Sequence, residues 1–188
     1  LTAHKSIAMP GCSINNPTLT EADLRNLAVA KQYKVTDVML PFVRNKADLI
    51  ILREALREYG CEDIRIFAKI ENMTGVEHLE ELIPYCDYIV IARGDLGNAM
   101  PLSQLPRIQA HIARVCRKHN KDFMIVTQML DSMIKNPYPT RAEVNDIYHA
   151  VTQGASTLML TGETAHGRYP VEAMKMLVET ANGSLEEL

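Results

Sequence analysis

The chain repeats one pattern: a short apolar run stops at polar residues, and a stretch with helical spacing follows. Five such runs occur, at Val35–Phe42, Ile64–Glu71, Tyr88–Ala92, Phe123–Thr127 and Thr157–Leu160. Apolar runs of roughly four to eight residues predict buried strands. Their alternation with helical stretches is typical of βα units arranged around a parallel sheet. The sequence therefore predicts an α/β protein.

Helix signals lie between these runs. Thr140 is a predicted N-cap that forms a full capping box with Glu143, because the Glu side chain can reach back to an unsatisfied backbone amide. The other predicted helices follow the N-cap Thr20, span Asn45 to Tyr59 and Ser103 to His119, and begin at Pro170. Each of them carries apolar residues along one side, as expected for helices that cover a sheet.

Repeated βα units fit either an open doubly wound sheet or a (β/α)8 TIM-type barrel. An open sheet usually binds phosphates at a Gly-rich first turn, and the sequence contains no GxGxxG or GxxxxGK[ST] pattern. Polar residues at several strand ends favour the barrel, whose strand ends surround a common mouth. We therefore predict one domain over residues 1–188, a partial barrel of about five βα units. Its open edges would be covered by missing barrel segments or by another chain of a homo-oligomer.

Composition excludes several classes of protein. The net charge is −3 and the basic residues are scattered, so the basic footprint of a nucleic-acid binder is missing. The four cysteines, Cys12, Cys61, Cys86 and Cys116, include no CxxC pair, which favours reduced thiols over a disulfide framework or a zinc site. No apolar run approaches the roughly 18 residues of a membrane span, and no signal-peptide pattern opens the chain. We expect a soluble, cytoplasmic protein with no nucleic-acid or membrane partner.

Two carboxylates lie at the ends of adjacent predicted strands. Glu71 and Asp95 offer hard oxygen ligands, which suit Mg²⁺ or Mn²⁺ with water and substrate oxygens completing the coordination. Lys69, one pleat before Glu71, projects from the same strand face and could neutralise a developing oxyanion. These three residues predict a metal-assisted site for a small anionic substrate.

Neighbouring strand ends carry further candidates. Gly94 would let backbone amides of the Ala92–Asp95 turn approach a small ligand. Thr127 and Thr161 supply hydroxyls that can hold a carboxylate or relay a proton. Each signal also has a structural interpretation: Lys69 and Glu71 as a solvated ion pair, Arg93 and Asp95 as a turn salt bridge, both threonines as strand-edge hydroxyls, and Glu163 as a residue near a helix N-terminus. Four successive strands that end in polar groups favour a functional site.

Read in order, these strand ends resemble the pyruvate kinase family. The matching motifs are Lys69-Ile-Glu-Asn72, Ala92-Arg-Gly-Asp-Leu-Gly97, Thr127-Gln-Met-Leu130 with Ser132-Met-Ile-Lys135, Pro139-Thr-Arg-Ala-Glu143, and Gly162-Glu-Thr-Ala165. They follow the family's order with similar spacing and cover nearly the whole chain. The resemblance implies phosphoryl transfer between phosphoenolpyruvate and ADP, giving pyruvate and ATP in glycolysis.

The resemblance also implies residue roles and cofactors. Lys69 would stabilise the enolate and the transferring phosphoryl group, and Glu71 and Asp95 would hold Mg²⁺. The substrate carboxylate would be bound by the turn formed by Ala92, Arg93, Gly94 and Asp95 and by the hydroxyl of Thr127. Thr161 and Glu163 match catalytic positions near the proton route to the enolate carbon. K⁺ is also expected, with ligands that are not in this chain.

The sequence departs from the family pattern at several points. Ser6-Ile-Ala-Met-Pro-Gly11 replaces a usual Gly-Val-Asn-Leu-Pro-Gly, Pro41 replaces a serine, and Thr161 replaces a serine but keeps the hydroxyl. His166 stands where many members carry a nucleotide-facing lysine. The family's first barrel strands, its lid domain and its C-terminal regulatory domain have no counterpart in this sequence, so we expect mainly the metal and pyruvate half of a site.

Two other functions remain open from the residues. One is a Mg²⁺-dependent lyase that forms a pyruvate enolate, similar to aldolases whose barrels also end strands in Glu and Asp. The other is a non-catalytic half-barrel that binds a partner or a second copy of itself. Aldehyde-dependent consumption of pyruvate without ATP would distinguish the lyase, and the association state in solution would test the pairing.

Overall fold

The computed structural model describes residues 16–185 and contains one five-stranded parallel sheet. Its strands are β1 Asp37–Leu40, β2 Arg65–Ile70, β3 Tyr88–Ala92, β4 Asp122–Val126 and β5 Thr157–Met159. All five predicted strands are present, although most are shorter than predicted. The backbone explains two of the new ends: Phe42 and Thr127 adopt φ values of 51° and 81°, which cannot continue a strand.

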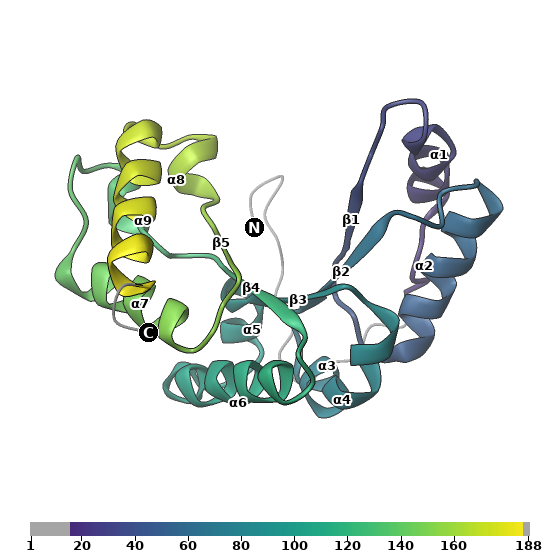
Figure 1. Ribbon diagram of the computed structural model, residues 1–188, viewed down its shortest axis with the longest axis horizontal. Coiled ribbons are helices and arrows are strands. Elements are labelled where there is room, and N and C mark those ends of the chain that lie inside the picture. The colour runs from purple at the N-terminus through teal and green to yellow at the C-terminus, as the bar shows by residue number, and fades with distance from the viewer. Residues whose placement is uncertain (1–15, 186–188) are drawn as a thin grey trace, which may run out of the picture.

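The order of the strands decides between the two predicted architectures. The order is β1-β2-β3-β4-β5, so each strand pairs with the next one in the chain and the order never reverses. A doubly wound sheet would contain a reversal, the switch point at which it binds ligands. Figure 1 shows the strands as an open arc with α2, α4, α6 and α7 along its convex side. The prediction of a partial TIM-type barrel is confirmed.

The described residues contain nine α-helices and three 3₁₀ turns. The helices are α1 Glu21–Ala30, α2 Lys46–Glu58, α3 Met73–Glu77, α4 Leu79–Leu82, α5 Arg93–Asn98, α6 Leu105–Lys118, α7 Arg141–Thr152, α8 Gly162–Ala165 and α9 Pro170–Leu185. The 3₁₀ turns are η1 Ile83–Tyr85, η2 Leu102–Gln104 and η3 Asp131–Ile134. The predicted N-caps Thr20 and Thr140 are confirmed, each in a capping box, whereas the short helices α3, α4, α5 and α8 were not predicted.

The sheet is apolar on both faces. Ile89 and Ile91 of β3 pack into the main core with the helices, and the alternate residues Val90 and Ala92 form a second cluster on the opposite, inner face. Phe67 of β2 packs against this inner cluster. Side chains alternate along a strand, so Lys69 also projects from the inner face. The carboxyl end of β2 therefore presents a lysine on the inner face of the sheet.

Both outer strands of the arc have a neighbour on one side only among the described residues. β1 pairs with β2, and β5 pairs with β4. The free sides carry backbone donors and acceptors that another strand could pair with. Five βα units therefore form part of a barrel wall, as predicted.

Three of the four cysteines lie within the described residues. Cys61, Cys86 and Cys116 are free and buried, while Cys12 and the Ser6–Gly11 motif lie outside the described residues. Burial raises the pKa of Cys86 and of Cys116 to about 12, so both remain protonated at neutral pH. None of the helices within residues 16–185 is long and apolar enough to cross a membrane.

Gly75 provides a test of how tightly α3 packs beneath the strand ends. A Cβ atom at Gly75 would lie 2.5 Å from the carbonyl oxygen of Val43, whereas one at Gly183 would meet nothing within 4 Å. We expect Gly75→Ala to lower the free energy of unfolding by about 1–3 kcal/mol, because backbone must move to make room. Gly183→Ala should raise it by up to about 1 kcal/mol through helix propensity. Urea denaturation measures both, and equal stabilities for the two variants would contradict this packing.

Candidate active site

The predicted site residues lie at the carboxyl edge of the sheet. Lys69 and Glu71 are at the end of β2, Ala92 to Asp95 at the end of β3, Thr127 just after β4, and Thr161 and Glu163 shortly after β5. All strands are parallel, so these ends share one edge. The fold thus brings four separate sequence motifs to the same side of the molecule.

Lys69 and Glu71 form a mostly buried ion pair. Nζ of Lys69 lies 2.6 Å from Oε1 of Glu71, and the side chains are 24 % and 1 % exposed. The other carboxylate oxygen, Oε2, accepts a hydrogen bond of 2.7 Å from the backbone N–H of Phe42. A solvated surface pair would contribute little to stability. Here the Glu71 carboxylate is fixed by the Phe42 N–H after β1, and it holds the Lys69 ammonium on the inner face of the sheet.

Phe42 is a residue of this edge that the sequence analysis missed. It combines a φ of 51° with a ring that is 57 % exposed, an unusual backbone conformation for a bulky residue. Its N–H is the donor to Glu71. The only sequence signal is Pro41, which favours a turn at this position but does not predict that an aromatic residue will adopt positive φ.

The end of β3 meets the end of β4 through Gly94. A Cβ atom at Gly94 would lie 3.0 Å from Cγ2 and 3.6 Å from Oγ1 of Thr127, so a larger residue would press on the threonine side chain. Asp95, the next residue, is exposed in the first turn of α5. Gly94 thus allows the end of β3 to approach the Thr127 side chain closely.

Arg93 turns away from Asp95 and supports the β4 end instead. Its Nη1 lies 2.8 and 2.7 Å from the two carboxylate oxygens of Asp146 in α7. Its Nε and Nη2 donate to the carbonyl of Thr127 at 3.2 and 2.9 Å, and Nη2 also donates to the carbonyl of Gln128. The turn salt bridge considered for Arg93 and Asp95 is therefore replaced by a pair with Asp146, which the sequence analysis did not identify.

Glu163 joins the ends of β4 and β5. It is 1 % exposed, and its Oε1 accepts a 3.0 Å hydrogen bond from the N–H of Leu130. Its Oε2 accepts from the N–H of Thr161 at 2.8 Å and lies 3.4 Å from the Thr161 hydroxyl. Glu163 and Thr161 are therefore in contact, as a proton route would require, and the carboxylate also braces two loops.

Glu143 of α7 makes further hydrogen bonds to the loop that follows β4. Besides its capping bond to Thr140, it accepts hydrogen bonds from the N–H and hydroxyl of Ser132 at 2.7 and 2.6 Å. Burial alone would raise the pKa of Glu143, but the bonds from Ser132 and Thr140 outweigh it and hold the pKa below its ordinary value. Glu143 was predicted only as a helix cap, and the structure adds a link between η3 and α7.

The carboxylates of Glu71 and Asp95 could supply only some of the ligands of a metal ion. Within residues 16–185, no group of three or more His, Cys, Asp or Glu side chains could hold a metal ion. Glu71 and Asp95 supply two carboxylates at adjacent strand ends, and each carboxylate oxygen of Glu71 retains a lone pair beyond its present partner. A hard divalent cation bound here would need substrate oxygens and water as its other ligands.

His166 lies close to Gly162, in the segment that follows β5. Its side chain is exposed, and a Cβ atom at Gly162 would lie 3.0 Å from the histidine Cε1.

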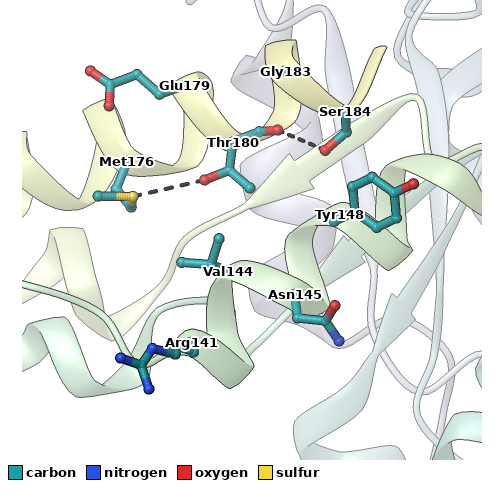
Figure 2. Close-up of a pocket in the computed structure, with 9 residues that line it drawn as sticks. All are labelled: Arg141, Val144, Asn145, Tyr148, Met176, Glu179, Thr180, Gly183 and Ser184. Atoms are coloured by element: carbon teal, nitrogen blue, oxygen red, sulfur yellow. Dashed lines mark hydrogen bonds between the residues drawn. The ribbon is translucent and has the colours of Figure 1, made fainter. Parts of the chain in front are cut away.

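A shallow groove of about 510 Å³ lies between α7 and α9, and none of the strand-end residues lines it. Figure 2 shows Val144 of α7 pointing towards the segment of α9 that carries Met176 and Thr180, across this groove. The groove is thus separate from the candidate site.

The fold and the site together define a TIM-barrel-type α/β protein with charged groups gathered at its strand ends. Residues 1–174 match the family described as "Pyruvate kinase, barrel domain", and the chain belongs to that family. The resemblance stated from the strand-end motifs is therefore confirmed.

Relatives from several organisms match nearly the whole chain. It is 39 % identical to the pyruvate kinase of Clostridium acetobutylicum over 186 residues, covering 99 % of this chain and 39 % of that protein. It is 40 % identical to the Kluyveromyces lactis pyruvate kinase, covering 96 % of this chain and 36 % of that protein. It is 41 % identical to the Borreliella burgdorferi enzyme, covering 94 % and 37 %. The chain thus spans less than two fifths of the length of these relatives.

The low pKa of Glu143 predicts a pH-dependent contribution to stability. The folded state favours the ionised carboxylate, so the stabilisation should be complete above the ordinary pKa of 4.5 and decline as the pH falls through the folded pKa. Glu143→Gln should therefore be less stable than the unchanged chain at pH 7, by about 1–3 kcal/mol, with a smaller difference at pH 3.5. Urea denaturation at both pH values measures this. A difference that does not shrink at low pH would show that the charge of Glu143 is irrelevant.

Proposed function

We propose that this chain carries the metal and pyruvate half of a pyruvate kinase active site, which transfers a phosphoryl group between phosphoenolpyruvate and ADP. The observation that carries the proposal is the mostly buried Lys69–Glu71 pair on the inner face, one strand away from Asp95. Membership of the pyruvate kinase barrel family supports it. Such transfers depend on positioning and charge neutralisation more than on covalent help from the protein.

Lys69 would stabilise negative charge on the enolate oxygen and the transferring phosphoryl group. Its ammonium is held by Glu71, whose own position is set by the Phe42 N–H, so the cation is fixed before the substrate arrives. A preorganised charge of this kind typically contributes about 3–4 kcal/mol to a transition state. Glu71 and Asp95 would together hold Mg²⁺ or Mn²⁺, which would neutralise substrate charge when bound.

The carboxylate of the substrate would be bound between the ends of β3 and β4. The proposed groups are the backbone of the turn from Ala92 through Arg93 to Gly94 and Asp95, and the hydroxyl of Thr127. Gly94 and Thr127 are close enough to act on one small anion, since a Cβ at Gly94 would lie 3.6 Å from the Thr127 oxygen. Thr161 and Glu163, which are in hydrogen-bond contact, would serve the proton route to the enolate carbon.

The remaining parts of the reaction would need groups beyond these residues. K⁺ ligands and the strands that close the barrel against β1 and β5 would come from segments that this sequence does not contain. His166 in place of a lysine would weaken the contact to a nucleotide phosphate. We propose residues 1–188 as one partial barrel domain, acting in the cytoplasm on phosphoenolpyruvate and ADP and paired along its open edges with further barrel segments or a second chain.

Deuterium exchange of the pyruvate methyl protons tests the enolate half directly. We expect this chain to catalyse exchange in D₂O, followed by NMR, only when Mg²⁺ is present, because removing a methyl proton creates the enolate that the site would stabilise. Asp95→Asn should abolish the metal-dependent exchange. Asp37→Asn is the matched control, since Asp37 lies at the amino end of β1 and pairs with Arg65. No exchange above the Mg²⁺ background with the unchanged chain would contradict the proposal.

Lys69→Met separates stabilisation of the enolate from metal binding. We expect it to slow the exchange by about 10²–10³-fold, the usual effect of losing a preorganised charge. Binding of Mn²⁺, measured by water-proton relaxation, should be largely retained, because Glu71 and Asp95 remain. Lys118→Met removes an exposed lysine paired with Glu80 and should change neither measurement. Near-normal exchange by Lys69→Met would exclude Lys69 from the reaction.

A further inference from the structure

The turn after β4 has an unusual backbone. Thr127 and Gln128 adopt φ values of 81° and 55°, so two successive residues other than glycine lie at positive φ. For a β-branched residue such as Thr127 this conformation is a genuine outlier, and such residues persist only where surrounding groups enforce them. Something in the structure must therefore hold this turn.

The guanidinium of Arg93 contacts both residues of the turn. Nε and Nη2 donate to the carbonyl of Thr127, and Nη2 also reaches the carbonyl of Gln128 at 3.2 Å. Nη2 further lies 3.0 Å from the sulfur of Met129. Three successive residues are thus gathered around one planar group, which fixes the directions of the two carbonyls and with them the backbone on either side.

Asp146 holds the guanidinium in this orientation. Nη1 lies within 2.8 Å of both its carboxylate oxygens, and the side chains of Arg93 and Asp146 are 9 % and 33 % exposed. A buried guanidinium needs a counter-charge, and a planar one needs an acceptor in its plane. Asp146 comes from α7, so the helix that follows the turn along the chain is tied back to the end of β3.

We propose that Arg93 and Asp146 are positioning residues that hold the Thr127–Gln128 turn in its left-handed conformation and so keep the Thr127 hydroxyl beside Gly94. The proposal rests on the proposed function only for the identity of the ligand, a small carboxylate. The pair acts through Thr127 and does not itself need to touch the substrate. Its loss therefore affects how well the carboxylate is bound more than how fast the bound molecule reacts.

Asp146→Asn tests the pair, with Asp37→Asn as the matched control. Both substitutions remove one carboxylate from an arginine ion pair, but Arg65 and Asp37 lie at the amino edge of the sheet. With Mg²⁺ present, the pyruvate concentration for half-maximal deuterium exchange should rise about tenfold in Asp146→Asn, whereas the maximal rate should change less than about twofold. Asp37→Asn should leave both quantities unchanged.

Gln128→Gly provides a rescue that a merely structural ion pair would not show. Glycine adopts positive φ without strain, so the turn then depends less on Arg93. The double variant Asp146→Asn with Gln128→Gly should recover most of the lost affinity for pyruvate. If Asp146→Asn does not fold, Asp146→Glu, which keeps the charge but displaces it, should give the same change in smaller measure.

Amide hydrogen exchange at Thr127 and Gln128, followed by NMR, keeps the test independent of activity. It should become at least about tenfold faster in Asp146→Asn and remain unchanged in Asp37→Asn, even if the chain does not enolise pyruvate and the proposed function fails. Unchanged exchange at these two amides would overturn the proposal. The proposal would also be overturned if Asp146→Asn lowered the global stability without changing the pyruvate concentration for half-maximal exchange. The same holds if the double variant did not recover affinity for pyruvate.

Discussion

Buried carboxylates that accept backbone N–H groups from neighbouring strand ends hold the mouth of this sheet together. Glu71 takes the N–H of Phe42 across β1 and β2, and Glu163 takes those of Leu130 and Thr161 across β4 and β5. Each is almost fully buried, so these hydrogen bonds compensate for the lost hydration of the charge. The positions of the proposed catalytic groups depend on these carboxylates, because each one fixes two loops at once.

Arg93 performs the corresponding task between β3 and β4 with the opposite charge. Its guanidinium donates hydrogen bonds to backbone carbonyl oxygens, whereas the carboxylates accept them from backbone N–H groups. Asp146 of α7 balances the charge of the guanidinium. Backbone polar groups left over where strands end in turns are thus satisfied by side chains along most of the edge. The contacts that satisfy the backbone polar groups of these loops also position Lys69 and Thr127. The proposed catalytic groups are therefore held rigidly.

Much of the fold could be predicted because it depends on local patterns. The apolar runs, the N-caps at Thr20 and Thr140 and the barrel-type fold could be read from periodicity, cap residues and the polar strand ends. The positive φ of Phe42 and the pairing of Arg93 with Asp146 could not be predicted, since each depends on a partner 29 or 53 residues away. For Arg93, the nearest acid in sequence was the wrong partner.

The sequence by itself determined which groups stand at the strand ends, because the period of two places Lys69 and Glu71 on one face and the motifs identify the family. Only the tertiary structure decided what those groups contact. It made Lys69 and Glu71 a mostly buried pair, turned Arg93 towards α7, and brought Gly94 against Thr127. The physical reason is that alternation and helix caps are local properties, whereas burial and ion pairing arise when distant strand ends pack along a common edge.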